Sequence, residues 1–114
     1  MKKIIRRILF TLILFTSFIV TSQKIYSVNS QYEADVKVYV VGSQYEADLL
    51  VYKVGSQYET GDNDGKWFFT DSQYSAKKKI FFTGSQYEAD LKIYFVGSQY
   101  EAGWKDSSKK YLLY

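Results

Sequence analysis

The side chains that could support chemistry in this chain are carboxylates, hydroxyls and amides, because the sequence contains no His and no Cys. That composition removes the commonest general base, the thiol nucleophile and nearly every transition-metal site. Glu33, Glu46, Glu88 and Glu101 could form the carboxylate pairs of glycosidases, yet they recur at one place in a repeated motif. Such recurrence indicates a structural role, so we expect no enzyme activity, no catalytic residue and no cofactor.

A short acidic segment is the one candidate for metal binding. Asp62-Asn63-Asp64-Gly65 is similar to part of a calcium loop, in which alternating oxygen ligands precede a turn glycine. The first and last ligand positions would fall on Thr60 and Asp71, where Asp and Glu are expected. Asp62 and Asp64 are therefore weak calcium candidates, and a polar turn that ends in Asp-Gly explains the same residues.

A repeat sets the elements that must position these side chains. Ser-Gln-Tyr occurs six times, beginning at Ser30, Ser43, Ser56, Ser72, Ser85 and Ser98, with steps of 13, 13, 16, 13 and 13 residues. After each Tyr the apolar residues alternate with polar ones, as from Tyr32 to Val40. A period of two with Val, Ile, Tyr and Phe predicts β-strands.

The residues between the predicted strands favour tight turns. Gly42-Ser43 and its equivalents supply Gly, Asn or Asp, which tolerate the positive φ of two-residue hairpins. Hairpins there would pair Lys24 with Asp35 and Lys79 with Asp90, so the local pattern predicts antiparallel neighbours. In each turn we expect Ser to bond the local backbone and Tyr to pack inward.

Alignment of the units gives a strand count and a domain count. Seven strand endings follow from it: residues 24–26, 37–39, 50–52, 66–68, 79–81, 92–94 and 110–112. The third and sixth units share a polar insertion after Glu59 and Glu101, which makes the chain two blocks of three repeats. Since no Pro-rich or low-complexity linker interrupts them, we expect a single domain over residues 23–114.

Aromatic side chains are the feature that could bind a partner. A second row of rings, Tyr26, Tyr39, Tyr52, Phe68, Phe81 and Tyr94, lies opposite the Ser-Gln-Tyr tyrosines. Either the chain wraps on itself and buries these rings, or one row is a binding surface. The candidate ligand-binding residues are Tyr39, Tyr52, Tyr94, Trp67 and Trp104, which suit a sugar ring or a protein partner.

The first residues have the layout of a secretory signal peptide, with a basic start, a short apolar middle and small residues before a cut. We predict a signal peptide over residues 1–22, cleaved between Ser22 and Gln23, and a secreted or periplasmic product. The remaining 11 Lys (15 − 4) face 12 acidic residues, a net charge of −1 without any Arg. We therefore expect a monomer that does not bind nucleic acid and meets a membrane only through the uncleaved leader.

The repeated Ser-Gln-Tyr-Glu-Ala-Asp-Leu-Lys-Ile-Tyr-Phe-Val, as in residues 85–96, resembles the Septknot family of small bacterial proteins. The resemblance covers residues 24–114, and it implies a compact β-rich domain with a seven-crossing knot and no established activity. Two blocks of three repeats suit a chain that makes two laps, with Thr60–Lys66 as the link between them.

The sequence thus predicts an all-β, compact, intertwined domain of about seven short strands. The alternatives are an unknotted antiparallel meander or a small barrel. The expected function is that of a secreted structural or binding protein, and the alternative is a carbohydrate-binding module that uses exposed aromatic side chains.

Overall fold

The computed structural model describes residues 22–114, so the predicted signal peptide lies outside the described residues except for Ser22. Short strands and single turns of 3-10 helix make up the described chain. The strands are β1 (Lys24–Ser27), β2 (Val36–Val40), β3 (Leu49–Lys53), β4 (Lys66–Phe69), β5 (Lys78–Phe82), β6 (Leu91–Phe95) and β7 (Gly103–Trp104). The 3-10 turns are η1 (Gln31–Glu33), η2 (Gln44–Glu46), η3 (Gln57–Glu59), η4 (Gln99–Glu101) and η5 (Ser107–Leu113).

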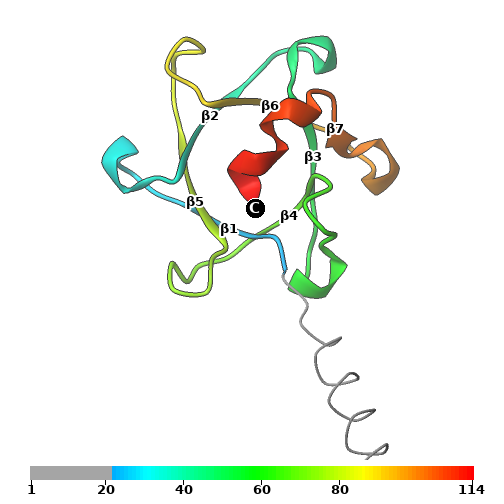
Figure 1. Ribbon diagram of the computed structural model, residues 1–114. Coiled ribbons are helices and arrows are strands. Elements are labelled where there is room, and N and C mark those ends of the chain that lie inside the picture. Colours follow the sequence, from blue (N-terminus) through cyan, green and yellow to red (C-terminus); the bar gives the residue numbers. More distant parts are fainter. Residues whose placement is uncertain (1–21) are drawn as a thin grey trace, which may run out of the picture.

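Six of these strands close a parallel barrel. The order across the sheet is β4-β1-β5-β2-β6-β3-β7, and a further pairing of β4 with β3 joins the ends of the six-stranded part. Figure 1 looks down the barrel and shows the strands as a ring from which loops radiate. The prediction of a compact all-β domain is confirmed, in the form of a small barrel.

The chain lays down this barrel in two interleaved laps. β1, β2 and β3 take alternate positions in the first lap; then β4 enters between β3 and β1, and β5 and β6 fill the two remaining gaps. The predicted link, Thr60–Lys66, follows β3 and ends on the first residue of β4. Two blocks of three repeats therefore correspond to two laps, as the repeat spacing predicts.

Each connection returns along the outside of the barrel, because consecutive parallel strands must start at the same end. We call these connections the arms. The arm between β1 and β2 carries η1, which packs against β5, and the arm between β2 and β3 carries η2, which packs against β6. An arm thus crosses over the strand that the other lap inserts beneath it.

Inward-facing side chains stack in three layers, and positions 13 or 16 residues apart in the sequence share a layer. The middle layer, all of it fully buried, contains Ile25, Val38, Val51, Trp67, Ile80 and Ile93. At the amino ends of the strands the layer contains Gln23, Val36, Leu49, Gly65, Lys78 and Leu91. At the carboxyl ends it contains Ser27, Val40, Lys53, Phe69, Phe82 and Phe95, all of which keep some exposure to solvent.

The C-terminal η5 closes the amino end of the barrel (Figure 1, red). Its Leu113 is fully buried and belongs to the hydrophobic core. Two buried amides hold it in place: Gln23 Nε2 donates to the Leu113 carbonyl oxygen at 3.2 Å, and Asn63 Nδ2 donates to the Lys110 carbonyl oxygen at 2.9 Å. Among residues 22–114, an element therefore plugs the barrel at its amino end only.

The predicted antiparallel pairing is wrong for the barrel, because its six strands are all parallel and only β7 runs antiparallel to β3. The turn residues do not form two-residue hairpins. Within residues 22–114, positive φ occurs at Asn63, Gly65 and Gly103 and not at Gly42 or its equivalents. Each Ser-Gln-Tyr instead begins a longer arm that carries the chain back to the other end of the barrel.

The seventh predicted strand is also misplaced. Residues 110–112 lie within η5, and the seventh strand consists of Gly103 and Trp104. The polar stretch before residue 110 is a 3-10 helix whose N-cap is Asp106, since that carboxylate accepts a hydrogen bond from the Ser108 backbone.

Candidate functional site

The tips of the arms are built by the Ser-Gln-Tyr motif. In η1, η2, η3 and η4 the Ser hydroxyl oxygen accepts a hydrogen bond from the Tyr backbone N–H, at 3.2 to 3.3 Å. The Ser is thus an N-cap, and the Glu three residues later completes the sequence pattern of a capping box. This spacing is the sequence signal that a hairpin interpretation overlooks.

Two arms use a different cap, for a reason visible in the sequence. Where four arms have Val two residues before Ser, the fourth and fifth have Thr70 and Thr83. The hydroxyl of each Thr accepts a hydrogen bond from the backbone N–H of Ser72 or Ser85, at 3.2 and 3.3 Å. These arms form plain turns instead of 3-10 helices, yet their Tyr occupies the same position at the tip.

The tyrosines at the six tips are the most exposed large hydrophobic side chains of the arms. We call this set, Tyr32, Tyr45, Tyr58, Tyr74, Tyr87 and Tyr100, the tyrosine crown. Their exposed fractions run from 81% at Tyr45 to 92% at Tyr74. The expectation that these rings pack inward is wrong, because the turn at each tip, 3-10 in four arms and plain in two, directs the Tyr away from the barrel.

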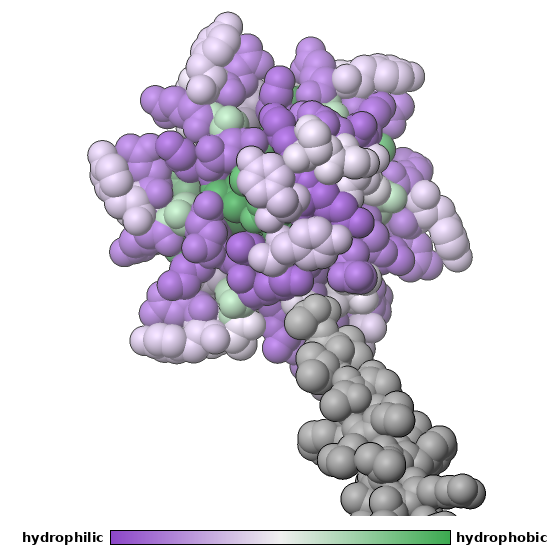
Figure 2. Space-filling model, in the orientation of Figure 1, coloured by the Kyte–Doolittle hydropathy of each residue, from purple (hydrophilic) through white to green (hydrophobic). Residues whose placement is uncertain are grey.

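Figure 2 shows separate projections around the rim of the molecule, with the strongly hydrophobic residues recessed between them. The crown therefore consists of six separate aromatic side chains arranged around the barrel, and it is not one continuous apolar patch. Among the described residues one cation contacts it: Lys105 Nζ lies 5.3 Å from the centre of the Tyr45 ring.

In the first, second and fifth arms the Asp of the motif fastens the arm to the strand beneath it. Asp35 Oδ2 accepts a hydrogen bond from the Lys79 backbone N–H at 2.9 Å, and the Asp35 N–H donates to the Lys79 carbonyl oxygen at 2.8 Å. The same two-point contact joins Asp90 to Lys37. The predicted pairs of Lys24 with Asp35 and Lys79 with Asp90 do not form, because an arm lies over the other lap and not over its own neighbour in sequence.

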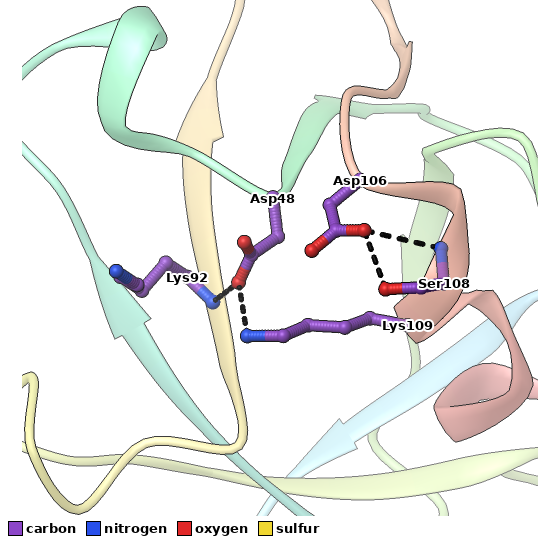
Figure 3. Close-up of polar contacts among 5 residues, drawn as sticks. All are labelled: Asp48, Lys92, Asp106, Ser108 and Lys109. Atoms are coloured by element: carbon purple, nitrogen blue, oxygen red, sulfur yellow. Dashed lines mark hydrogen bonds and ion pairs between the residues drawn. The ribbon is translucent and has the colours of Figure 1, made fainter.

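At Asp48 this contact is enlarged by the C-terminal segment (Figure 3). Asp48 Oδ2 accepts from the Lys92 backbone N–H at 2.9 Å and from the Lys109 ammonium at 3.1 Å. Nearby, the Ser108 hydroxyl and backbone N–H donate to Asp106 at 2.6 and 3.1 Å, and these bonds lower the pKa of the Asp106 carboxyl. The Asp48 and Asp106 carboxylates therefore join the second arm, β6 and the C-terminal η5.

The five residues predicted to bind a ligand do not lie together on the surface. Tyr39, Tyr52 and Tyr94 are half-buried on the outer face of the barrel, where the arms cross. Trp67 is fully buried in the middle layer. Trp104 is half-buried, and its Nε1 donates to the Asn63 carbonyl oxygen at 2.8 Å. The half-buried positions favour the reading in which the chain wraps over these rings.

The two calcium candidates, Asp62 and Asp64, have different surroundings. Asp62 is exposed, whereas the Asp64 carboxylate lies 3.4 Å from the Lys66 ammonium and accepts from the Lys66 backbone N–H. Within residues 22–114 no three His, Cys, Asp or Glu side chains are grouped to hold a metal ion. In the same part of the chain, no helix is long and apolar enough to cross a membrane.

A closed parallel barrel laid down in two interleaved laps defines a class of small β-repeat domains. A family model described as the 7(1) septoil knot domain, Septknot, matches residues 22–105, and the chain belongs to this family. The family expected from the Ser-Gln-Tyr-Glu-Ala-Asp motif is thereby confirmed. No curated protein and no solved structure gives a significant match to the chain.

Proposed function

We propose that this protein is a non-catalytic binding protein whose contacts are made by the tyrosine crown. The observation that carries the proposal is the exposure of all six rings, each at least 81% exposed. Tyr is a common interface residue, since it buries a large area at a small cost in conformational entropy. The fold itself does not use these rings, because they contribute nothing to the core.

The fourth arm supports this interpretation. Ser75 and Lys77 replace the Glu and Asp of the motif there, so the carboxylate that fastens the first, second and fifth arms to the barrel is missing. Tyr74 is nevertheless present, and it is the most exposed ring of the crown. The motif thus tolerates loss of a residue that stabilises the barrel while it keeps the one that faces solvent.

A repeating carbohydrate chain is the partner that suits this arrangement best. The flat face of an exposed Tyr can stack on the apolar face of a sugar ring, and its hydroxyl can exchange hydrogen bonds with sugar hydroxyls. One such contact is weak, but six copies on a rigid ring raise the avidity for a polymer with many equivalent sites. This is the carbohydrate-binding role, moved from the half-buried Tyr39, Tyr52 and Tyr94 to the crown.

The test is a glycan array and a pull-down with insoluble cellulose, chitin and peptidoglycan. The full chain is compared with a variant in which all six crown tyrosines are replaced by Ala, and with a Tyr39→Ala, Tyr52→Ala, Tyr94→Ala control. We expect the wild type to bind, the crown variant to remain folded without binding, and the control to keep binding wherever it folds. No binding by the wild type, or equal binding by the crown variant, would exclude the crown as a carbohydrate site.

We propose further that the two laps form a seven-crossing knot. An arm of the first lap is bonded through Asp35 to β5, and an arm of the second lap is bonded through Asp90 to β2. Each lap therefore passes both outside and beneath the other. This mutual crossing is what supports a threaded chain, and its kinetic test is described in the Discussion.

We also propose that the protein is exported and acts as a monomer outside the cytoplasm, after removal of residues 1–22. The support is the layout of the leader, in which four cations precede an uncharged run. The intact mass of the exported protein should correspond to a chain that begins at Gln23. A full-length mass in the membrane fraction would instead indicate an uncleaved anchor.

A further inference from the structure

The two ends of the barrel differ, and the difference points to a second binding surface. η5 covers the amino ends of the strands, where Leu113 completes the core. No such element covers the carboxyl ends within residues 22–114. There the carboxyl-end layer of inward-facing side chains itself faces solvent, with Val40 and Phe82 exposed at 41% and 37%. We call this layer, Ser27, Val40, Lys53, Phe69, Phe82 and Phe95, the open mouth.

The neighbours around the barrel explain how the open mouth is shaped. Ser27 lies between Phe69 and Phe82 in the order of strands, and its small side chain lets these two rings stack with centres 6.5 Å apart. On the other side, Lys53 lies between Phe95 and Phe69. Its ammonium stands 4.4 Å from the centre of the Phe95 ring and 5.5 Å from that of Phe69.

Lys53 is the only charged residue of the open mouth. Its ammonium makes no ion pair or hydrogen bond with any side chain of residues 22–114, whereas Lys109 and Lys66 each reach a carboxylate. A cation over the faces of two rings is held by their quadrupoles, which fix its position without neutralising its charge. The open mouth is thus an apolar platform with one uncompensated positive charge in a fixed place.

We propose that the open mouth binds a soluble anionic amphiphile, a single apolar chain that ends in a carboxylate. The carboxylate pairs with the Lys53 ammonium, and the apolar chain lies on Phe69, Phe82 and Val40. Charge complementarity selects the head, since an anion satisfies Lys53 and a cation meets like charge. If the Lys53 stem served only to shield the rings from water, anionic and cationic amphiphiles would bind equally well. A binding role for the Lys53 ammonium instead requires that the anionic one bind more tightly.

The test uses the full chain and sodium dodecanoate below its critical micelle concentration, followed by amide chemical shifts. We expect saturable one-to-one binding with shifts confined to the carboxyl ends of the barrel strands. Dodecyltrimethylammonium, which has the same chain and the opposite charge, should bind at least about tenfold more weakly. Lys53→Gln should weaken dodecanoate binding by about tenfold or more, while Lys53→Arg should retain it.

Matched variants separate this site from the crown and from general charge effects. Lys37→Gln removes a cation from the outer face of β2 and should leave dodecanoate binding unchanged. Phe82→Ser should weaken dodecanoate binding. The six-tyrosine crown variant should bind dodecanoate like the wild type, so the experiment tests the open mouth independently of the crown. The proposal is overturned by an absence of saturable shifts, by equal affinity for the two amphiphiles, or by an unaffected Lys53→Gln variant. Binding to anionic phospholipid vesicles without binding to dodecanoate would also overturn it, since the surface would then be a membrane contact.

Discussion

At the scale of single residues, the repeated Asp is the side chain that joins the two laps. Asp48 is buried and accepts hydrogen bonds from the Lys92 backbone and the Lys109 ammonium. We expect Asp48→Ala to lower the free energy of unfolding by about 2 to 3 kcal/mol, because it removes charge-assisted bonds and leaves a backbone donor unpaired. Urea unfolding measures this directly. Asp71→Ala, at an exposed position in the fourth arm, should stay within about 0.5 kcal/mol of wild type, and an equal loss in both variants would contradict the role of Asp48.

The alternation of Lys and Asp predicted pairs of opposite charge between neighbouring strands, and those pairs do not form. The Asp carboxylates instead accept hydrogen bonds from the backbone N–H of strand Lys residues, to which the Lys charge is irrelevant. Hydrogen bonds such as Asp48 to Lys92 span 44 residues, however, because an arm crosses a strand of the other lap. A pattern of neighbouring residues contains no information about partners so far apart in the sequence. The outward Tyr could have been found from the Ser-x-x-Glu spacing, which predicts a helical turn in place of a hairpin.

At the scale of elements, some glycines occupy positions where the backbone conformation requires Gly, and others occupy positions where another residue would fit. Gly65 has φ of 93°, and a Cβ there would lie 2.4 Å from the Leu50 carbonyl oxygen. Gly42 has no atom within 4 Å of a Cβ and no positive φ. Gly65→Ala should therefore cost about 2 kcal/mol or more, whereas Gly42→Ala should be neutral or stabilise by up to about 1 kcal/mol. Thermal melts of the two variants check this, and similar melting temperatures for both would contradict it.

The barrel strands were predictable because their alternation is strong, and six of the seven strand endings fall within strands of the structure. Whether the strands pair parallel or antiparallel was not predictable, because Gly, Asn and Ser suit both a hairpin and the start of a long return arm. The seventh ending failed for a different reason. The sequence of residues 110–112 resembles the strand endings, but these residues form part of a 3-10 helix. That helix places Leu113 in the core at the amino end of the barrel.

At the scale of the whole molecule, a knotted double lap should unfold very slowly, because the chain must withdraw a terminus through the other lap before it is free. We expect an unfolding rate constant in water below about 10⁻⁵ per second, from extrapolated urea kinetics. As a control, a protease site inserted between Ser72 and Gln73, within an exposed arm, allows the folded chain to be cut. Cutting should speed unfolding at least about a hundredfold relative to the uncut insert. Unfolding within seconds, or at equal rates before and after the cut, would argue against a threaded chain.

The central functional claim is that the tyrosine crown binds a repeating polymer through several equivalent contacts. Its most direct test is the affinity of the full chain for one polysaccharide, measured as crown tyrosines are replaced by Ala one after another. We predict that the polymer binds about a hundredfold more tightly than its own short oligomer, and that this advantage falls steeply with each replacement until no binding remains. An affinity for the polymer that is the same with six crown tyrosines as with none would contradict the account.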